Sequence, residues 1–143
     1  MHPDVRRYLG GPALPERAAM RAAKFSQGDV PNAWAVHLHQ HLALGCVGLV
    51  QIAPHHDGFD LELSYEFLPT VWGTGIASEA IRVVIVHAFR SLGLTRLLAE
   101  TQSENQPSRR LLARVGMQHE RDVERFGATQ AIYAVDAAWC NRV

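Results

Sequence analysis

The stretch Val71-Trp72-Gly73-Thr74-Gly75-Ile76-Ala77 is the part of the sequence that decides the fold. An apolar run ends just before it at Pro69, and a helix-patterned segment follows it without a break to Gly93. A strand, a glycine loop and a helix in this order direct several backbone N–H groups and the positive end of a helix dipole at one anion. We therefore predict that this loop holds the pyrophosphate of a cofactor.

Two common phosphate-binding loops do not fit this stretch. The Gly-Lys-Ser/Thr ending of a Walker A loop is absent, and Ser78 stands at the third glycine position of the dinucleotide fingerprint. Glycine pairs are also frequent in plain turns, so an ordinary turn is the alternative. The context favours an anion site, because the predicted helix starts without a side-chain cap and its free amides need a partner.

Composition narrows the class of protein. The 143 residues suffice for one domain with a real core, and 48% hydrophobic with 20% charged residues is typical of a soluble globular protein. A formal net charge of zero argues against nucleic acid or a membrane as partner, since both need a basic face. Cys46 and Cys140 form no CxxC pattern, which indicates reduced thiols in a cytoplasmic protein. We expect no signal peptide and no membrane span, because the apolar stretches are too short.

The length and the lack of a dividing linker predict a single domain over residues 1–143, and hydrophobic periodicity predicts its elements. The predicted helices cover residues 15–25, 76–92 and 105–115, and the predicted strands cover 33–38, 42–52, 59–68, 95–101, 118–125 and 129–136. Strands 59–68 and 95–101 flank a helix, so they should be parallel and joined by a right-handed crossover. Gly45 and Gly48 inside the second strand indicate a bulge or a close approach.

Three runs carry a family resemblance: P-T-V-W-G-T-G-I-A-S-E-A from Pro69, H-A-F-R-S-L-G-L-T-R-L-L-A-E-T from His87, and N-Q-P-S-R-R-L-L-A-R-V-G-M from Asn105. At this spacing they resemble the GNAT superfamily of acetyl-CoA-dependent N-acetyltransferases. Within it, the nearest branch is that of ribosomal-protein N-terminal acetyltransferases of the RimJ/RimL kind. The resemblance implies an α+β fold: a mixed, twisted sheet of about six strands, helices on both faces, and acetyl-CoA between splayed parallel strands.

The resemblance also implies which residues would bind acetyl-CoA. The backbone N–H groups matching the family's pyrophosphate cradle belong to Trp72, Gly73, Thr74, Gly75, Ile76 and Ala77. Backbone groups of Phe67 and Leu68 match the positions beside the pantetheine arm, where one N–H would polarise the thioester carbonyl. Asn105 would orient the cofactor arm, with helix capping as its alternative role.

Two residues are the catalytic candidates for attack of an amine on the thioester. Glu62 occupies the acidic position of the E-x-x-Y stretch before the loop and would act as the base; a purely structural glutamate is the alternative. Glu66 is the alternative candidate for the base. Side chains alternate between the two faces of a strand, so Glu62 and Glu66 share one face and Tyr65 lies on the other. Ser108 would donate a proton to the departing thiolate, with helix capping again as the alternative.

The sequence departs from the family pattern at several points. Thr70 stands where the superfamily often has Gln or Arg, Met117 replaces a phenylalanine, and Leu112 stands where many members have a tyrosine. Members usually also carry a strand and helix ahead of anything resembling residues 4–11, so we expect an exposed edge or one supplied by a homodimer. A catalytically silent acyl-CoA-binding regulatory module is therefore the alternative function.

The acceptor and any metal are the least determined features. The acceptor is a primary amine, either a protein N-terminus or a small amine such as an aminoglycoside; a polyamine ranks last because a neutral chain offers no acidic patch. His37, His39 and His41 alternate on one predicted strand, and His55 and His56 share a turn. We expect no metal, because no carboxylate is placed to support these ligands. The histidines would line the acceptor side or face solvent.

Overall fold

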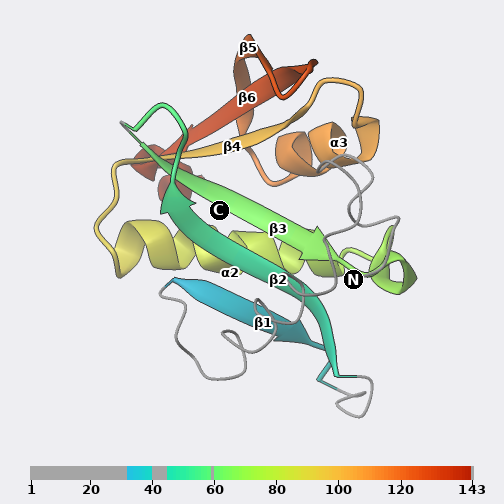
Figure 1. Ribbon diagram of the computed structural model, residues 1–143. Helices are drawn as coiled ribbons and strands as arrows, with labels where there is room; N and C mark the ends of the chain where they lie inside the picture. Colours follow the sequence, from blue (N-terminus) through green and yellow to red (C-terminus); the bar gives the residue numbers. More distant parts are fainter. Residues whose placement is uncertain (1–31, 40–44, 59, 143) are drawn as a thin grey trace.

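The computed structural model describes residues 32–39, 45–58 and 60–142 (Figure 1). The strands are β1 (Ala33–His37), β2 (Cys46–Pro54), β3 (Leu61–Phe67), β4 (Arg96–Gln102), β5 (Gln118–Arg125) and β6 (Ala128–Asp136). The helices are α2 (Ile76–Arg90) and α3 (Gln106–Arg114), with short 3-10 turns η3 (Pro69–Val71) and η4 (Ala137–Asn141). The helix expected over 15–25 and the residues 42–44 of the expected second strand lie outside the described residues.

The strands form one six-stranded mixed sheet in the order β1-β2-β3-β4-β6-β5. β3 and β4 are parallel and every other neighbouring pair is antiparallel, which confirms the predicted crossover through α2. β3 and β4 are in register at Glu62 and Leu98, near the start of both strands, and they diverge toward their C-terminal ends (Figure 1). This opening between parallel strands is the gap in which the sequence predicts the cofactor arm.

α2 forms where the apolar stripe predicts it, and it begins at Ile76 as expected. Ile81, Ile85 and Ala88 on its inner face are fully buried, because residues three and four apart share one side of a helix. The helix ends at Arg90 rather than at residue 92, and Leu92 is exposed. Gly93 follows with a φ of 68°, the left-handed conformation expected of a glycine after a helix end.

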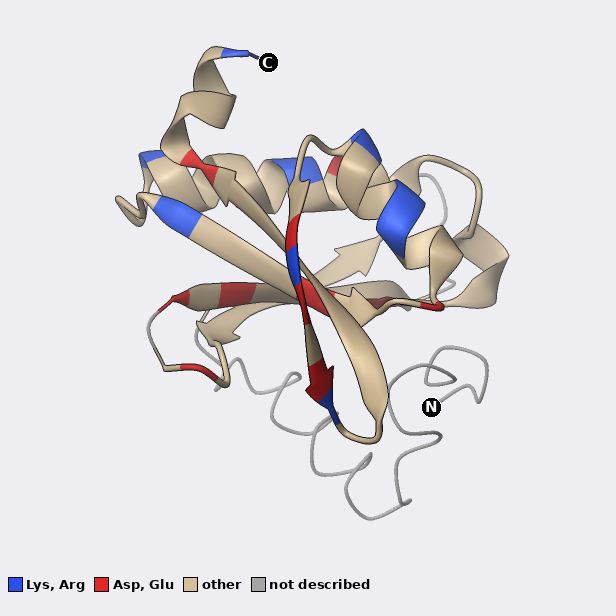
Figure 2. Ribbon diagram, turned by 90° about the horizontal axis from the view of Figure 1, so that it is seen from above, with Lys and Arg blue, Asp and Glu red and all other residues tan. Residues whose placement is uncertain are grey.

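α2 and α3 lie together on one face of the sheet (Figure 2). The Arg82 side chain of α2 donates to the Arg114 carbonyl at the end of α3 at 3.0 Å, which joins the two helices. Between them and the sheet lies the apolar core, with Val50, Leu63 and Leu112 among its most buried side chains. No helix in ranges 32–39, 45–58 and 60–142 is long and apolar enough to cross a bilayer.

Both features predicted at the glycines of the second strand are found: the β1–β2 register shifts between Val36 and His37, and Gly48 makes a close approach. A Cβ at Gly48 would come within 2.3 Å of the Phe67 ring, so only glycine leaves room for that ring. Phe67 is the last residue of β3, at the mouth of the gap between β3 and β4. The sequence of β2 therefore shapes the end of β3.

Candidate active site

The loop between β3 and α2 has the features of an anion cradle. Gly73 and Gly75 have φ values of 72° and 84°, and a Cβ at either position would meet nothing within 4 Å. Gly75 is the N-cap of α2, and no side chain caps the helix there. The Thr74 hydroxyl donates to the Val71 carbonyl at 2.5 Å and holds the loop in shape. Within ranges 32–39, 45–58 and 60–142 no side chain caps the first amides of α2, which lie at the positive end of the helix dipole and fit a diphosphate.

The end of β3 presents one backbone donor toward the gap. The Leu68 N–H donates to the Val47 carbonyl at 2.9 Å, on the β2 side. Consecutive backbone groups of a strand point to opposite sides, so the Phe67 N–H is directed toward β4. The Trp72 indole donates to the Phe67 carbonyl at 2.9 Å, which ties the glycine loop to the strand. Of the two predicted positions, Phe67 therefore suits the polarising role, whereas the Leu68 N–H is already bonded.

The start of α3 brings Ser108 against a residue that the sequence reasoning left without a role. The Asn105 side chain accepts from the Ser108 N–H at 3.2 Å, so Asn105 caps the helix, as its alternative role predicts. The Ser108 Oγ lies 2.5 Å from the Tyr65 hydroxyl. Burial raises the pKa of Tyr65 to about 12, so its phenol stays protonated at neutral pH. Strand parity already placed Tyr65 opposite Glu62 and could have indicated this face.

Glu62 has the electrostatics of a general base. Burial, the largest cause, raises the pKa of Glu62 to about 7; His55 and Arg125 oppose the rise, and the Glu100 carboxylate adds to it. A base is most effective when its pKa lies near the working pH. Glu62 also stands at the residue pair from which β3 and β4 diverge. The competing Glu66 is buried on the same strand face.

The predicted catalytic residues approach the gap from opposite faces of the sheet. Tyr65 and Ser108 lie on the face that α2 and α3 cover, and strand alternation places Glu62 on the other face. No hydrogen bond within the described residues joins Glu62 to Ser108. A group bound in the gap between β3 and β4 would therefore have a base on one side and a hydroxyl donor on the other.

The histidines of the β2–β3 turn behave differently from each other. His55 is only 3% exposed, and its Nε2 lies 2.6 Å from a Glu100 carboxylate oxygen, so the expectation of a solvated residue is wrong for His55. His56 is exposed and its ring contacts that of Phe126. Within ranges 32–39, 45–58 and 60–142, no three metal-ligating side chains converge on one point. His41 lies outside the described residues.

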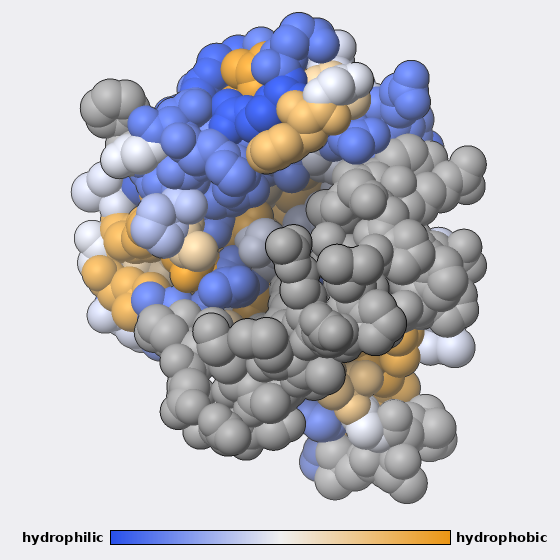
Figure 3. Space-filling model, in the orientation of Figure 1, coloured by the Kyte–Doolittle hydropathy of each residue, from blue (hydrophilic) through white to orange (hydrophobic). Residues whose placement is uncertain are grey.

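Charged side chains of both signs cover β5. Its sequence, QHERDVER, places Arg121 within 2.8 Å of Glu120 and Arg125 within 3.0 Å of Asp57 in the β2–β3 turn. Figure 3 shows a hydrophilic surface at the top of the molecule, where β5 and β6 lie. Because the charges alternate and pair, this surface is not a one-sided basic face.

Comparison with known proteins agrees with this geometry. Residues 1–118 match the family described as Acetyltransferase (GNAT) domain. Over 77 residues the chain is 38% identical to the uncharacterized N-acetyltransferase YoaA of Bacillus subtilis, which covers 54% of this chain and 42% of YoaA. The fold is similar to that of a GNAT-family acetyltransferase from Bacillus anthracis, with a TM-score of 0.77 and 23% identity, covering 94% of this chain and 82% of that one.

A second solved structure shares the fold and contains a ligand. It is that of Mycobacterium smegmatis RimJ in complex with CoA-disulfide, with a TM-score of 0.64 and 25% identity, covering 86% of this chain and 60% of that one. The chain thus spans 42% of the length of YoaA and 60% of the length of the RimJ chain. The family match covers most of the 143 residues and includes β1 to α3. The protein therefore belongs to the GNAT family of acetyltransferases.

Proposed function

We propose that the protein is an acetyl-CoA-dependent N-acetyltransferase of the RimJ/RimL-like branch that acts on a primary amine. The observation that carries this proposal is the uncapped start of α2 behind two left-handed glycines, beside the gap between β3 and β4. Acetyl-CoA would supply an activated acetyl thioester there. The CoA-disulfide held by Mycobacterium smegmatis RimJ supports a CoA-type ligand for this fold.

Each residue of the site has one task in this proposal. The backbone of Trp72 to Ala77 binds the pyrophosphate, and the Phe67 N–H polarises the carbonyl of the transferred group. Glu62 takes the proton of the attacking amine, which needs a base that is ionised at neutral pH. Ser108 gives a proton to the departing thiolate.

Tyr65 completes the donor side of the site. A serine hydroxyl has one proton, so Ser108 can direct it toward the sulfur only while it accepts, rather than donates, in its hydrogen bond with Tyr65. The Tyr65 phenol stands 2.5 Å from the Ser108 Oγ and would donate this hydrogen bond. Tyr65 would thus supply, from β3, the phenol that many relatives carry at the position of Leu112.

The acceptor class and the setting belong to the same proposal. A protein N-terminus fits the RimJ/RimL-like branch, and a small amine is the competing acceptor. The paired, alternating charges of β5 disfavour a polycation. Two free cysteines, one exposed and one partly exposed, favour a reducing compartment such as the cytoplasm.

A silent acyl-CoA-binding module is the second candidate function. It is favoured by Leu112, which is fully buried in the core and offers no donor where many relatives have a tyrosine. Both candidates predict binding of acetyl-CoA, so binding does not separate them. They differ in whether an acetyl group is transferred.

The test is thiol release from acetyl-CoA, followed with a panel of peptides bearing free N-termini and of small amines. We expect release with at least one amine, and a loss of about 100-fold in kcat in Glu62→Gln, the lower range for one acid–base group. Ser108→Ala should also lose activity, whereas Glu124→Gln and Ser91→Ala, both exposed on the surface, should not. Tight binding of acetyl-CoA with no transfer to any acceptor would favour the silent module.

A further inference from the structure

The sheet face opposite α2 and α3 carries a group of buried charged residues. We call His55, Glu62, Glu100 and Arg125, together with Asp57 at their edge, the His55 cluster. The side chains of His55 and Glu100 are 0% and 6% exposed, although both are polar and titratable. Burying such groups costs stability that apolar side chains of similar size would avoid. Stability alone therefore does not explain why they are there.

Glu100 is held at both carboxylate oxygens. His55 Nε2 lies 2.6 Å from Oε2, and Arg125 Nε lies 3.4 Å from Oε1. His55 Nδ1 lies 3.4 Å from an Asp57 carboxylate oxygen, so each ring nitrogen of His55 faces a carboxylate. His55 thus donates to one oxygen of Glu100, and Arg125 forms an ion pair with the other.

Strand pairing brings Glu62 next to this clamped carboxylate. Glu62 is in register with Leu98, two residues before Glu100, so both glutamates point to the same face of neighbouring strands. The backbone of Glu100 is also among the groups that lower the pKa of Glu62. The charged groups that surround Glu62 are His55 from the β2–β3 turn, Glu100 from β4 and Arg125 from β5, with Glu66 farther along its own strand face.

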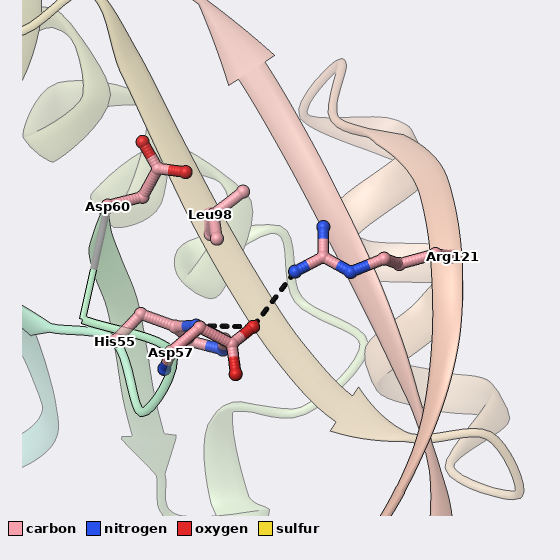
Figure 4. Close-up of a pocket in the computed structure, with 5 residues that line it drawn as sticks. All are labelled: His55, Asp57, Asp60, Leu98 and Arg121. Carbon is pink, nitrogen blue, oxygen red and sulfur yellow. Dashed lines mark hydrogen bonds and ion pairs between the residues drawn. The ribbon is translucent and has the colours of Figure 1, made fainter.

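A cavity reaches His55 and Asp57 of the His55 cluster. It has a volume of about 390 Å³ and is lined by His55, Asp57, Asp60, Leu98 and Arg121. Figure 4 shows His55 and Arg121 on either side of the Asp57 carboxylate, with Leu98 of β4 behind them. The Arg121 guanidinium donates to the Asp57 carboxylate at 2.9 Å, so these two lining residues are paired with each other.

We propose that His55 and Glu100 are positioning residues of the active site: Glu100, clamped by His55 and Arg125, holds the Glu62 side chain and sets the pH range in which Glu62 accepts a proton. The proposal rests on the proposed role of Glu62 as the base. In this proposal His55 acts through Glu100 and does not contact the acceptor. The negative charge of Glu100 favours a protonated Glu62, and the donors His55 and Arg125 oppose that effect.

The test measures the titration of Glu62 directly in the ligand-free protein. Carbon-13 NMR of glutamate-labelled protein reports each carboxyl, and Glu62→Gln identifies its signal. Glu100→Gln should move the Glu62 midpoint to lower pH, and His55→Gln should move it to higher pH. Each shift should be roughly one pH unit, the effect of one neighbouring charge. His56→Gln, in the same turn but exposed, is the matched control and should leave the midpoint unchanged.

Shifts of opposite sign are the result that a purely structural role would not produce. The acidic limb of kcat/KM against pH should move in the same two directions once an acceptor is known. If Glu62 titrates at the same midpoint in Glu100→Gln and His55→Gln as in the His56→Gln control, the proposal is overturned. If Glu100→Gln unfolds, the His55→Gln midpoint alone decides. Because the titration needs no turnover, a coupling without any acetyl transfer would sink the proposed function but still show that Glu100 and His55 control the protonation of Glu62.

Discussion

The raised pKa of Glu62 predicts that a substitution which lowers activity also stabilises the protein. The pKa of Glu62 moves from 4.5 to about 7 on folding. A raised carboxyl pKa means that the folded state binds the proton more tightly than the unfolded state. The protonated Glu62 therefore stabilises the fold fully below pH 4.5, and this stabilisation is lost as the pH rises through 7. At about 1.4 kcal/mol per pH unit, the ionised form of Glu62 costs about 3 kcal/mol of folding free energy above pH 7.

Glu62→Gln should remove this cost, because a neutral amide of the same shape replaces the carboxylate. The gain in unfolding free energy should grow by about 2 kcal/mol from pH 5 to pH 8, as measured by urea denaturation at both pH values. Glu120→Gln is the control, for which the change in unfolding free energy should have the opposite sign. Arg96 holds the pKa of Glu120 below its usual value, so loss of Glu120 should weaken the fold at pH 8. An equal effect of Glu62→Gln at both pH values would refute the reasoning.

Three further substitutions test the remaining contacts. Tyr65→Phe should lower kcat about tenfold and leave the KM for acetyl-CoA unchanged, because the phenol only orients Ser108; a change confined to KM would contradict this. Gly48→Ala should lower the unfolding free energy by about 1–3 kcal/mol in thermal denaturation, because its Cβ would meet the Phe67 ring; an unchanged Tm would show that the ring moves freely. Trp72→Phe should weaken CoA binding about fivefold in calorimetry, through loss of the hydrogen bond to Phe67, and unchanged affinity would argue against that tie.

Local patterns were enough to predict the elements that position the site. The apolar stripe of α2 and the glycines at its two ends predict Ile76 as its first residue and a left-handed Gly93 beyond its end. The βαβ order predicts that β3 and β4 are parallel. The helix bounds depend on residues within a few positions of each other, which is the range that periodicity and turn chemistry report, and the parallel pairing follows from the order of the elements.

Long-range contacts were beyond the reach of the same reasoning. His55 is separated by 45 positions from Glu100, and its turn context indicates an exposed residue. Tyr65 is separated by 43 positions from Ser108, so only strand parity hinted at its direction. Which donor satisfies a buried group depends on how the sheet twists and on which strands become neighbours. No local pattern contains that information.

The central claim is that the uncapped start of α2 binds the pyrophosphate of CoA. Calorimetric titration of CoA into the wild type, Gly75→Ala and Gly93→Ala tests it most directly. Both glycines have left-handed φ values and open space around a Cβ, so the two substitutions impose similar backbone strain at opposite ends of α2. We predict binding by the wild type, retained affinity in Gly93→Ala and a loss of tenfold or more in Gly75→Ala, whose Cβ would enter the cradle. No binding by the wild type, or an equal loss in both variants, would contradict the account.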